Sequence, residues 1–148
     1  MPERTGGPWL AIDYGERLVG LAMAHPMTGT ARPLPPLPNT SPERLDQDLS
    51  SVIEEWRPDR IIVGLPLAGD GAESAMSRKV RRFARRLAEQ VAPVEVELQD
   101  ERMTSELAAR QFAERRRSGR ARRKDAASLD SLAAAVILDA WMRDHGIV

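Results

Sequence analysis

Residues 9–24 read WLAIDYGERLVGLAMA, two apolar runs on either side of the polar turn Tyr14-Gly15-Glu16-Arg17. The first run, Trp9–Ile12, has the length of a buried strand and ends at Asp13, and Leu18–Ala24 resumes as a second strand. Because only a short turn separates the two runs, they predict an antiparallel hairpin that opens the fold.

Strands and helices alternate along the rest of the chain. The extended segment 30–37 carries three prolines, which restricts it to an edge strand or a loop because proline donates no ladder hydrogen bond. Capping, periodicity and breaker residues then predict a helix from Ser41-Pro42-Glu43 to about Arg57, a strand Ile61–Val63, a helix Glu73–Gln90, a strand Val94–Leu98, and helices Ser105–Arg117 and Ala126–Arg143. This order predicts an α/β fold, a three-layer sandwich whose mixed five-stranded sheet starts with the antiparallel hairpin and carries helices on both faces.

Length and composition indicate one ordinary globular domain spanning residues 1–148. The chain has no cysteine, which excludes structural disulfides and thiolate zinc sites. Neither the start of the chain nor its longest apolar run, Leu132–Leu138, resembles a secretory signal or a membrane span. We therefore expect a cytoplasmic protein with no membrane segment.

The basic residues are unevenly distributed although the formal net charge is zero. All but two of the 22 are arginines, and many fall in two clusters, at 78–86 and 110–124. Guanidinium groups match phosphate oxygens, so the second cluster especially is expected to bind a nucleic-acid backbone. The alternative for both clusters is a solvated helix face. The candidate binding residues of the second cluster are Arg116, Arg117, Arg120, Arg122, Arg123 and Lys124.

Acidic residues fall where an α/β sheet builds its sites, beyond the carboxyl ends of parallel strands. Asp13 ends the first strand, Asp100 and Glu101 follow the strand 94–98, and Asp130 lies near the start of the final helix. Carboxylates that converge at one edge repel one another unless a cation lies between them, and an all-oxygen ligand set favours Mg²⁺ or Mn²⁺. Such a site suits phosphodiester hydrolysis.

Each acid also has a structural alternative. Asp13 could open the turn that follows it, Asp100 and Glu101 could pair with Arg102 or cap the next helix, and Asp130 could favour the helix N-terminus. Because neighbouring side chains on a strand point to opposite faces, we expect Glu101 rather than Asp100 to face the site. The two histidines, His25 and His145, support neither a catalytic triad nor a zinc site.

Four segments together resemble the YqgF/RuvX family of resolvase-like nucleases, also described as pre-16S ribosomal RNA nucleases. The segments occur in order over residues 9–141 and are Asp13–Gly20 (DYGERLVG), Gly64–Leu67 (GLPL) with Asp70-Gly71, Asp100–Thr104 (DERMT) and Asp130–Ala134 (DSLAA). The chain departs from the family in having Ala24-His25 where Ser-Asp is common after the second strand, and in having no acid at the end of the strand Ile61–Val63.

The resemblance implies a ribonuclease-H-like fold and a Mg²⁺- or Mn²⁺-dependent endonuclease that acts on precursor ribosomal RNA or four-way-junction DNA. A homodimer would favour the junction substrate. The resemblance implies that Asp13, Glu101 and Asp130 are catalytic and hold the metal. It also implies a site-bordering loop and further nucleic-acid contacts, with Arg102 near the scissile phosphate. The loop residues are Gly64, Leu65, Pro66, Asp70 and Gly71, and the contacts are Arg17, Arg102, Thr104 and the basic segment 115–124.

Two other functions are compatible with parts of this pattern. One is a nucleic-acid-binding module that keeps the fold without catalysis, which the presence of all three acids argues against. The other is a phosphotransferase related to sugar kinases and actin-like ATPases, which also place Asp-x-Gly beside a hairpin. Those proteins close two such domains over a nucleotide, and 148 residues hold one, so we reject this reading.

Overall fold

The protein is described by a computed structural model that covers residues 8–101 and 131–147. Its elements in chain order are β1 (Trp9–Tyr14), β2 (Leu18–Ala24), β3 (Arg32–Pro38), α1 (Pro42–Trp56), β4 (Arg60–Leu65), α2 (Ala75–Val91), β5 (Glu95–Asp100) and α4 (Leu132–Asp144). The predicted helix Ser105–Arg117 and the first turn of the predicted last helix lie outside the described residues.

The five strands form one mixed sheet in the order β3-β2-β1-β4-β5. The pairs β1–β2 and β2–β3 are antiparallel, whereas β1–β4 and β4–β5 are parallel. The opening hairpin and the mixed sheet are therefore confirmed. β3 lies at one edge, where the prolines of its sequence RPLPPLP remove few ladder hydrogen bonds.

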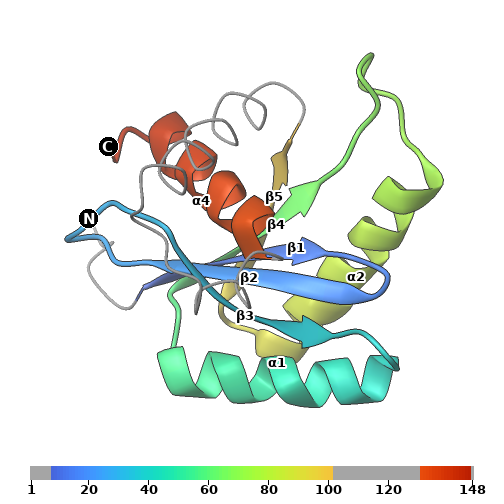
Figure 1. The fold of residues 1–148 in the computed structure, drawn as a ribbon, viewed down its shortest axis with the longest axis horizontal. Coiled ribbons are helices and arrows are strands. Elements are labelled where there is room, and N and C mark those ends of the chain that lie inside the picture. The colour runs from blue at the N-terminus through green and yellow to red at the C-terminus, as the bar shows by residue number, and fades with distance from the viewer. Residues whose placement is uncertain (1–7, 102–130, 148) are drawn as a thin grey trace, which may run out of the picture.

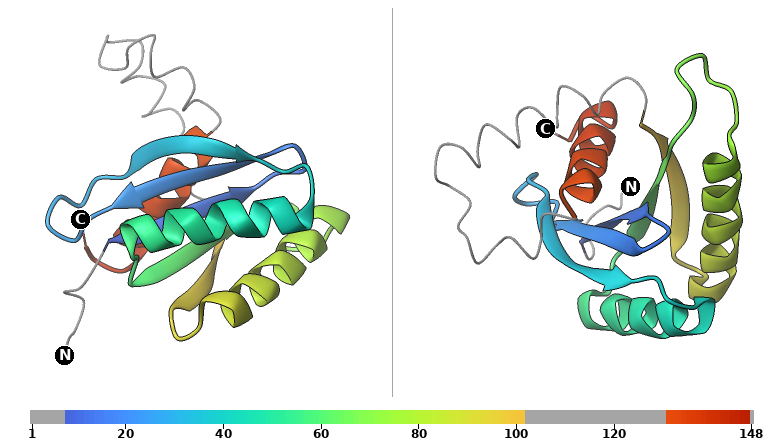
Figure 2. Two further views of the ribbon diagram at one scale, coloured as in Figure 1. Left: turned by 90° about the horizontal axis from the view of Figure 1, so that it is seen from below. Right: turned by 45° about the vertical axis from the view of Figure 1, so that its right-hand side comes forward.

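The helices cover both faces of the sheet, as Figures 1 and 2 show, with α4 on one face and α1 and α2 on the other. Strand residues alternate between the two cores: Trp9, Ala11 and Ile62 pack with α4, whereas Leu10 and Ile12 pack on the opposite face. The predicted three-layer sandwich is therefore confirmed. The alternation also sets which side chains of each strand can reach α4.

Several element boundaries differ from the sequence prediction. α1 begins as expected, because Ser41 caps it by accepting a hydrogen bond from the Arg44 amide at 3.2 Å. α2 begins at Ala75 rather than Glu73, because Ser74 and Ser77 cap it reciprocally.

The strands also run further than predicted. β1 continues through Asp13 to Tyr14 and β5 through Asp100, because both keep their pairing beyond the apolar runs. β4 continues through Gly64 and Leu65, which pair with Gln99 and Asp100 of β5, so these two residues belong to a strand and not to a loop. Across the described ranges 8–101 and 131–147, no helix is long and apolar enough to cross a membrane.

Candidate active site

Asp13 lies near the carboxyl end of β1, in the middle of the sheet. It follows Trp9 and Ala11 on the face that α4 covers, since alternate residues share a face. Its carboxylate is partly buried, and burial raises its pKa above the ordinary value of 3.8. Within the described part of the chain, no hydrogen bond or ion pair to its side chain compensates for this desolvation. Such a carboxylate favours a cation or a proton at this position.

Glu101 comes directly after β5 and continues its pairing, because its amide donates to the carbonyl of Leu65 at 3.3 Å. It shares the α4 face with Glu97, whose carboxylate accepts a hydrogen bond from Trp141 Nε1 of α4 at 3.1 Å. The pKa of Glu101 is raised to about 7, first by burial and then by the negative charges of Asp13 and Asp100. In the folded protein, Glu101 and Asp13 therefore lie close enough for their charges to interact.

Gly64 of β4 lies between the strands that carry these two acids. A Cβ at this position would lie 2.8 Å from Oε2 of Glu101 and 2.3 Å from Cδ1 of Ile137 in α4. The glycine therefore leaves the space that the Glu101 carboxylate occupies above the sheet. The sequence pattern placed Gly64 in a site-bordering loop and did not predict this role, although a glycine next to the buried run Ile61–Val63 is a sign of close approach.

Asp100 pairs with Leu65 at the end of β5, one residue before Glu101. Alternation places its side chain on the face of the sheet opposite to Glu101. Its charge still contributes to the raised pKa of Glu101. Glu101 is thus the acid of this pair on the α4 face, which it shares with Asp13.

Ser131 is a second residue whose role sequence analysis missed. Its hydroxyl is fully buried and accepts a hydrogen bond from the backbone amide of Leu21 at 2.9 Å. The pairing of β2 with β3 is irregular between Val19 and Leu21, and Leu21 itself pairs with Ile12, the residue before Asp13. Ser131 thus holds the start of α4 against the strand beside Asp13. The sequence feature that could have pointed to this role is the position of Ser131 in the DSLAA motif.

The loop after β4 satisfies its own backbone groups. The amides of Leu67, Ala68 and Gly71 donate to backbone carbonyls within the segment 65–72, and the Ala72 amide donates to Oδ1 of Asp70 at 3.0 Å. Gly71 has a φ of 89°, which explains the glycine there. These four amides are therefore engaged within the protein in this conformation and are not available to a phosphate.

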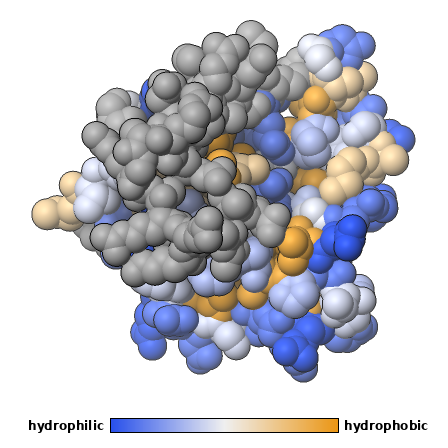
Figure 3. Space-filling model, viewed as in Figure 1, coloured by the Kyte–Doolittle hydropathy of each residue, from blue (hydrophilic) through white to orange (hydrophobic). Residues whose placement is uncertain are grey.

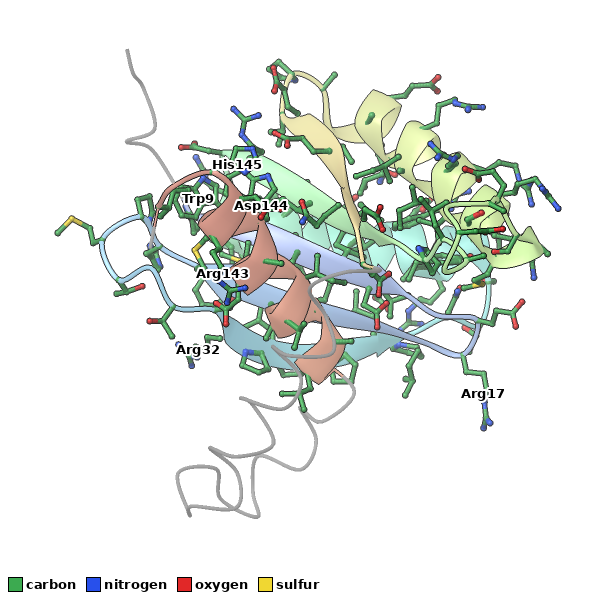
Figure 4. The ribbon with its side chains drawn as sticks, turned by 90° about the horizontal axis from the view of Figure 1, so that it is seen from above. Trp9, Arg17, Arg32, Arg143, Asp144 and His145 are labelled. Atoms are coloured by element: carbon green, nitrogen blue, oxygen red, sulfur yellow. The ribbon has the colours of Figure 1, made fainter. Side chains whose placement is uncertain are left out.

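The turn between β1 and β2 lies at the same end of β1 as Asp13. Asn39 stabilises it by donating from Nδ2 to the carbonyl of Gly15 at 2.8 Å and from its amide to the carbonyl of Arg17 at 2.9 Å. The Arg17 side chain is exposed and projects from this end of the hairpin into solvent, as Figure 4 shows. It is therefore free of the protein interior and available to a backbone phosphate.

The other predicted site residues lie outside the described ranges: Asp130, Arg102, Thr104, Arg116, Arg117, Arg120, Arg122, Arg123 and Lys124. In residues 8–101 and 131–147 no group of three or more acidic or histidine side chains is close enough to hold a metal. Within these ranges, Asp13 and Glu101 lie close enough for the charge of Asp13 to act on Glu101, and the pKa of each carboxyl group is raised. Both carboxylates are hard oxygen donors. Their chemistry fits Mg²⁺ or Mn²⁺ as two ligands of a larger set.

Comparison with known proteins identifies the family. Residues 7–144 match the model of the RuvX family, described as Holliday junction resolvase. Curated relatives named "Putative pre-16S rRNA nuclease" include one from Edwardsiella ictaluri, 38% identical over 92% of this chain and 94% of its own length. Another, from Xanthomonas oryzae pv. oryzae, is 40% identical over 92% of this chain and 87% of its own.

Solved structures agree on the fold. Thermus thermophilus RuvC in complex with a Holliday junction substrate superimposes with a TM-score of 0.60 and 20% identity over 96% of this chain and 98% of its own. The yeast mitochondrial Holliday junction resolvase Ydc2 gives 0.61 and 13% identity over 99% of this chain and 82% of its own. At these identities the two structures support the ribonuclease-H-like fold alone. From the family match and the curated relatives, the chain belongs to the RuvX family of resolvase-type nucleases, hydrolases that act on nucleic acid.

Proposed function

We propose that this protein is a Mg²⁺- or Mn²⁺-dependent endonuclease that hydrolyses phosphodiester bonds in structured nucleic acid. The observation that carries the proposal is the proximity of Asp13 and Glu101 above Gly64, where burial raises the pKa of both carboxyl groups and the charge of Asp13 adds to the rise at Glu101. Two partly buried acids held together at a strand end destabilise the empty site, so they are expected to serve a positively charged ligand.

Asp13, Glu101 and Asp130 would hold the metal, and a bound divalent ion would supply an activated water and stabilise the leaving oxygen. The protein residues have separate tasks. Asp13 presents a carboxylate that no described side chain neutralises. Glu101 must lose its proton to act as a ligand, and its pKa of about 7 makes that loss depend on pH near neutrality. Ser131 fixes the N-terminus of α4 next to β2.

Substrate binding would depend mainly on arginines. Arg17 is exposed at the end of the hairpin, and Arg102, Thr104 and the basic segment 115–124 would add contacts to the phosphate backbone. The curated relatives are named for pre-16S ribosomal RNA, so we propose a precursor ribosomal RNA in the cytoplasm as the first substrate. Four-way-junction DNA is the second candidate substrate. Two symmetric cuts in such a junction would need two active sites and therefore a homodimer.

The decisive experiment compares the wild type with Asp13→Asn on labelled precursor RNA and junction DNA, with Mg²⁺, Mn²⁺ or EDTA. We expect metal-dependent cleavage by the wild type. The variant should lose more than about 100-fold, since even outer-shell changes at metal sites cost 10–100-fold. RNA and DNA binding should persist, because it rests on arginines. Asp48→Asn is a matched control, since Asp48 lies on α1, on the other face of the sheet, and pairs with Arg44.

The outcomes separate two functions. Cleavage that Asp13→Asn retains would contradict the metal-site assignment. Tight binding without cleavage under every metal condition would instead support a nucleic-acid-binding module of the same fold. The substrate that is cut identifies the pathway.

A further inference from the structure

α2 carries three arginines on a single outward face. Arg78, Arg82 and Arg85 are separated by four and three residues, so they form one ridge along the helix. All three are exposed, while Val80, Phe83, Ala84 and Leu87 on the opposite side are buried against the sheet. We call these three residues the α2 ridge. In Figure 3 hydrophilic side chains predominate along the margin of the molecule over α2.

The other cations of α2 are engaged with the protein. Lys79 pairs with Glu16, Arg81 with Glu73 at 2.7 Å and Arg86 with Asp46 at 3.5 Å. The ridge arginines, in contrast, form no hydrogen bond or ion pair with any described residue; Arg78 contributes only a through-space charge that helps lower the pKa of Glu73. Glu89 is the acid that follows them on the same face. The helix therefore separates paired cations at its flanks from a positively charged ridge that faces solvent.

The ridge begins near the end of the sheet at which the candidate site lies, where the parallel strands have their carboxyl ends. α2 follows the loop that leaves the carboxyl end of β4, so its N-terminal turn lies at the same edge as Asp13 and Glu101 (Figure 2). The ion pair between Lys79 and Glu16 ties this turn of α2 to the hairpin that bears Arg17. Arg17 of the hairpin and Arg78, the first residue of the ridge, therefore lie at the same end of the sheet, each next in sequence to a partner of this ion pair.

We propose that the α2 ridge binds the phosphate backbone of a double-stranded RNA stem adjacent to the cleaved position. This inference rests on the proposed nuclease function and adds a second contact surface to it. Seven residues of helix span roughly 10 Å. Double-stranded DNA presents one phosphate per strand about every 3.4 Å along its axis, and an RNA duplex has a spacing of the same order, so three arginines match about three phosphates of one strand.

The ridge fits a duplex better than a single strand. Proteins that bind single strands stack bases on exposed aromatic side chains. The only aromatic residue of α2 is Phe83, which is buried, with the Arg86 guanidinium 5.9 Å from its ring centre. Double-stranded RNA is instead recognised through its shape and backbone. A precursor RNA that is paired next to its cleavage site would supply such a stem.

The test uses the triple variant Arg78→Gln, Arg82→Gln, Arg85→Gln. The matched control, Lys79→Gln, Arg81→Gln, Arg86→Gln, removes the same charge from the same helix but takes only cations that are already paired. Both sets are combined with Asp13→Asn and measured in EDTA, so that binding is read without cleavage. The probes are an RNA with a long stem, the same RNA with the stem removed, and a junction DNA with arms of equal length. Thermal unfolding of each variant shows that it is folded.

For the ridge variant we expect at least about tenfold weaker binding of the long-stem RNA, and a plot of log affinity against log salt that is shallower by about two to three. Binding of the stem-less RNA should change little, and the control should lose less of both. Equal losses in the two variants, or no loss in the ridge variant, would overturn the proposal. A loss confined to junction DNA would overturn its assignment to RNA. None of these binding measurements requires cleavage, so their result stands even if the nuclease assay detects no activity.

Discussion

Gly64 and Glu101 share one small space above the sheet: a Cβ on Gly64 would lie 2.8 Å from Oε2 of Glu101. The two residues come from adjacent parallel strands, and the Leu65 carbonyl next to Gly64 accepts the Glu101 amide. The position of the candidate metal ligand therefore depends on the absence of a side chain on its neighbour.

Gly64→Ala should leave the protein folded but impair the site. The added methyl would meet Cδ1 of Ile137 at 2.3 Å and Glu101 Oε2 at 2.8 Å, and both atoms are at the ends of side chains that can move. We expect a loss of about 1–2 kcal/mol in the free energy of unfolding, the usual range for overpacking, together with weaker Mg²⁺ binding and slower cleavage.

A second substitution separates the two effects. Ile137→Val removes Cδ1, so the double variant Gly64→Ala, Ile137→Val should recover stability in urea unfolding while cleavage stays impaired. Full recovery of activity in the double variant would show that Glu101 does not depend on Gly64 for its placement.

The stability of the metal-free protein should fall as the pH rises. Glu101 has a pKa of about 7 in the folded protein against an ordinary value of 4.5, so the folded state binds more protons between these limits. The free energy of unfolding is then largest below about pH 4.5 as far as this group is concerned and decreases as the pH rises through 7. Asp13 acts in the same direction, since its pKa is also raised.

Urea unfolding in EDTA from pH 5 to 8 measures this dependence. Glu101→Gln should flatten it, whereas Glu89→Gln, an exposed change on α2, should not. Mg²⁺ should stabilise the wild type more at pH 8 than at pH 6, because it competes with the proton. A Glu101→Gln protein with an unchanged pH slope would contradict the raised pKa.

Ser131→Ala should destabilise the protein and loosen the start of α4. The change leaves the buried amide of Leu21 without its acceptor, which costs about 1–3 kcal/mol. Faster hydrogen exchange at the Leu21 amide would report the lost bond directly. Ser51→Ala is the control, because its hydroxyl is on the surface of α1 and donates to Gln47 within the same helix. Equal stability of the two variants would exclude an anchoring role for Ser131.

Gly15→Ala should be more damaging to stability than Gly64→Ala. Its Cβ would lie 2.3 Å from the backbone carbonyl oxygen of Leu18, and a backbone atom of the hairpin cannot move aside as a side-chain tip can. We expect a loss near 3 kcal/mol, the upper end for overpacked sites. Thermal unfolding of the two variants side by side tests the order. A smaller loss at position 15 would mean that the turn accommodates the methyl group by rearranging.

Much of the fold could be predicted because its signals are local. Two apolar runs on either side of a short polar turn predicted the β1–β2 hairpin, and Ser41-Pro42 predicted the start of α1. The prolines of β3 predicted an edge strand, which the sheet order confirms. The predicted ends of two elements were wrong. β4 continues through Gly64 and Leu65 because its pairing with β5 continues, and α2 starts later because Ser74 and Ser77 cap the helix reciprocally.

The amino-acid pattern was enough to place Asp13 and Glu101 at strand ends and to assign each a face of the sheet, since alternation along a strand depends on the backbone alone. Three relationships could not be predicted without the folded structure. Glu101 lies above Gly64 near Asp13, and Ser131 accepts a hydrogen bond from an amide 110 residues away. Three arginines of α2 form no ion pair among the described residues, whereas the neighbouring cations pair with acids. These relationships depend on the register between strands and on the packing of helices, which bring together residues that no local pattern connects.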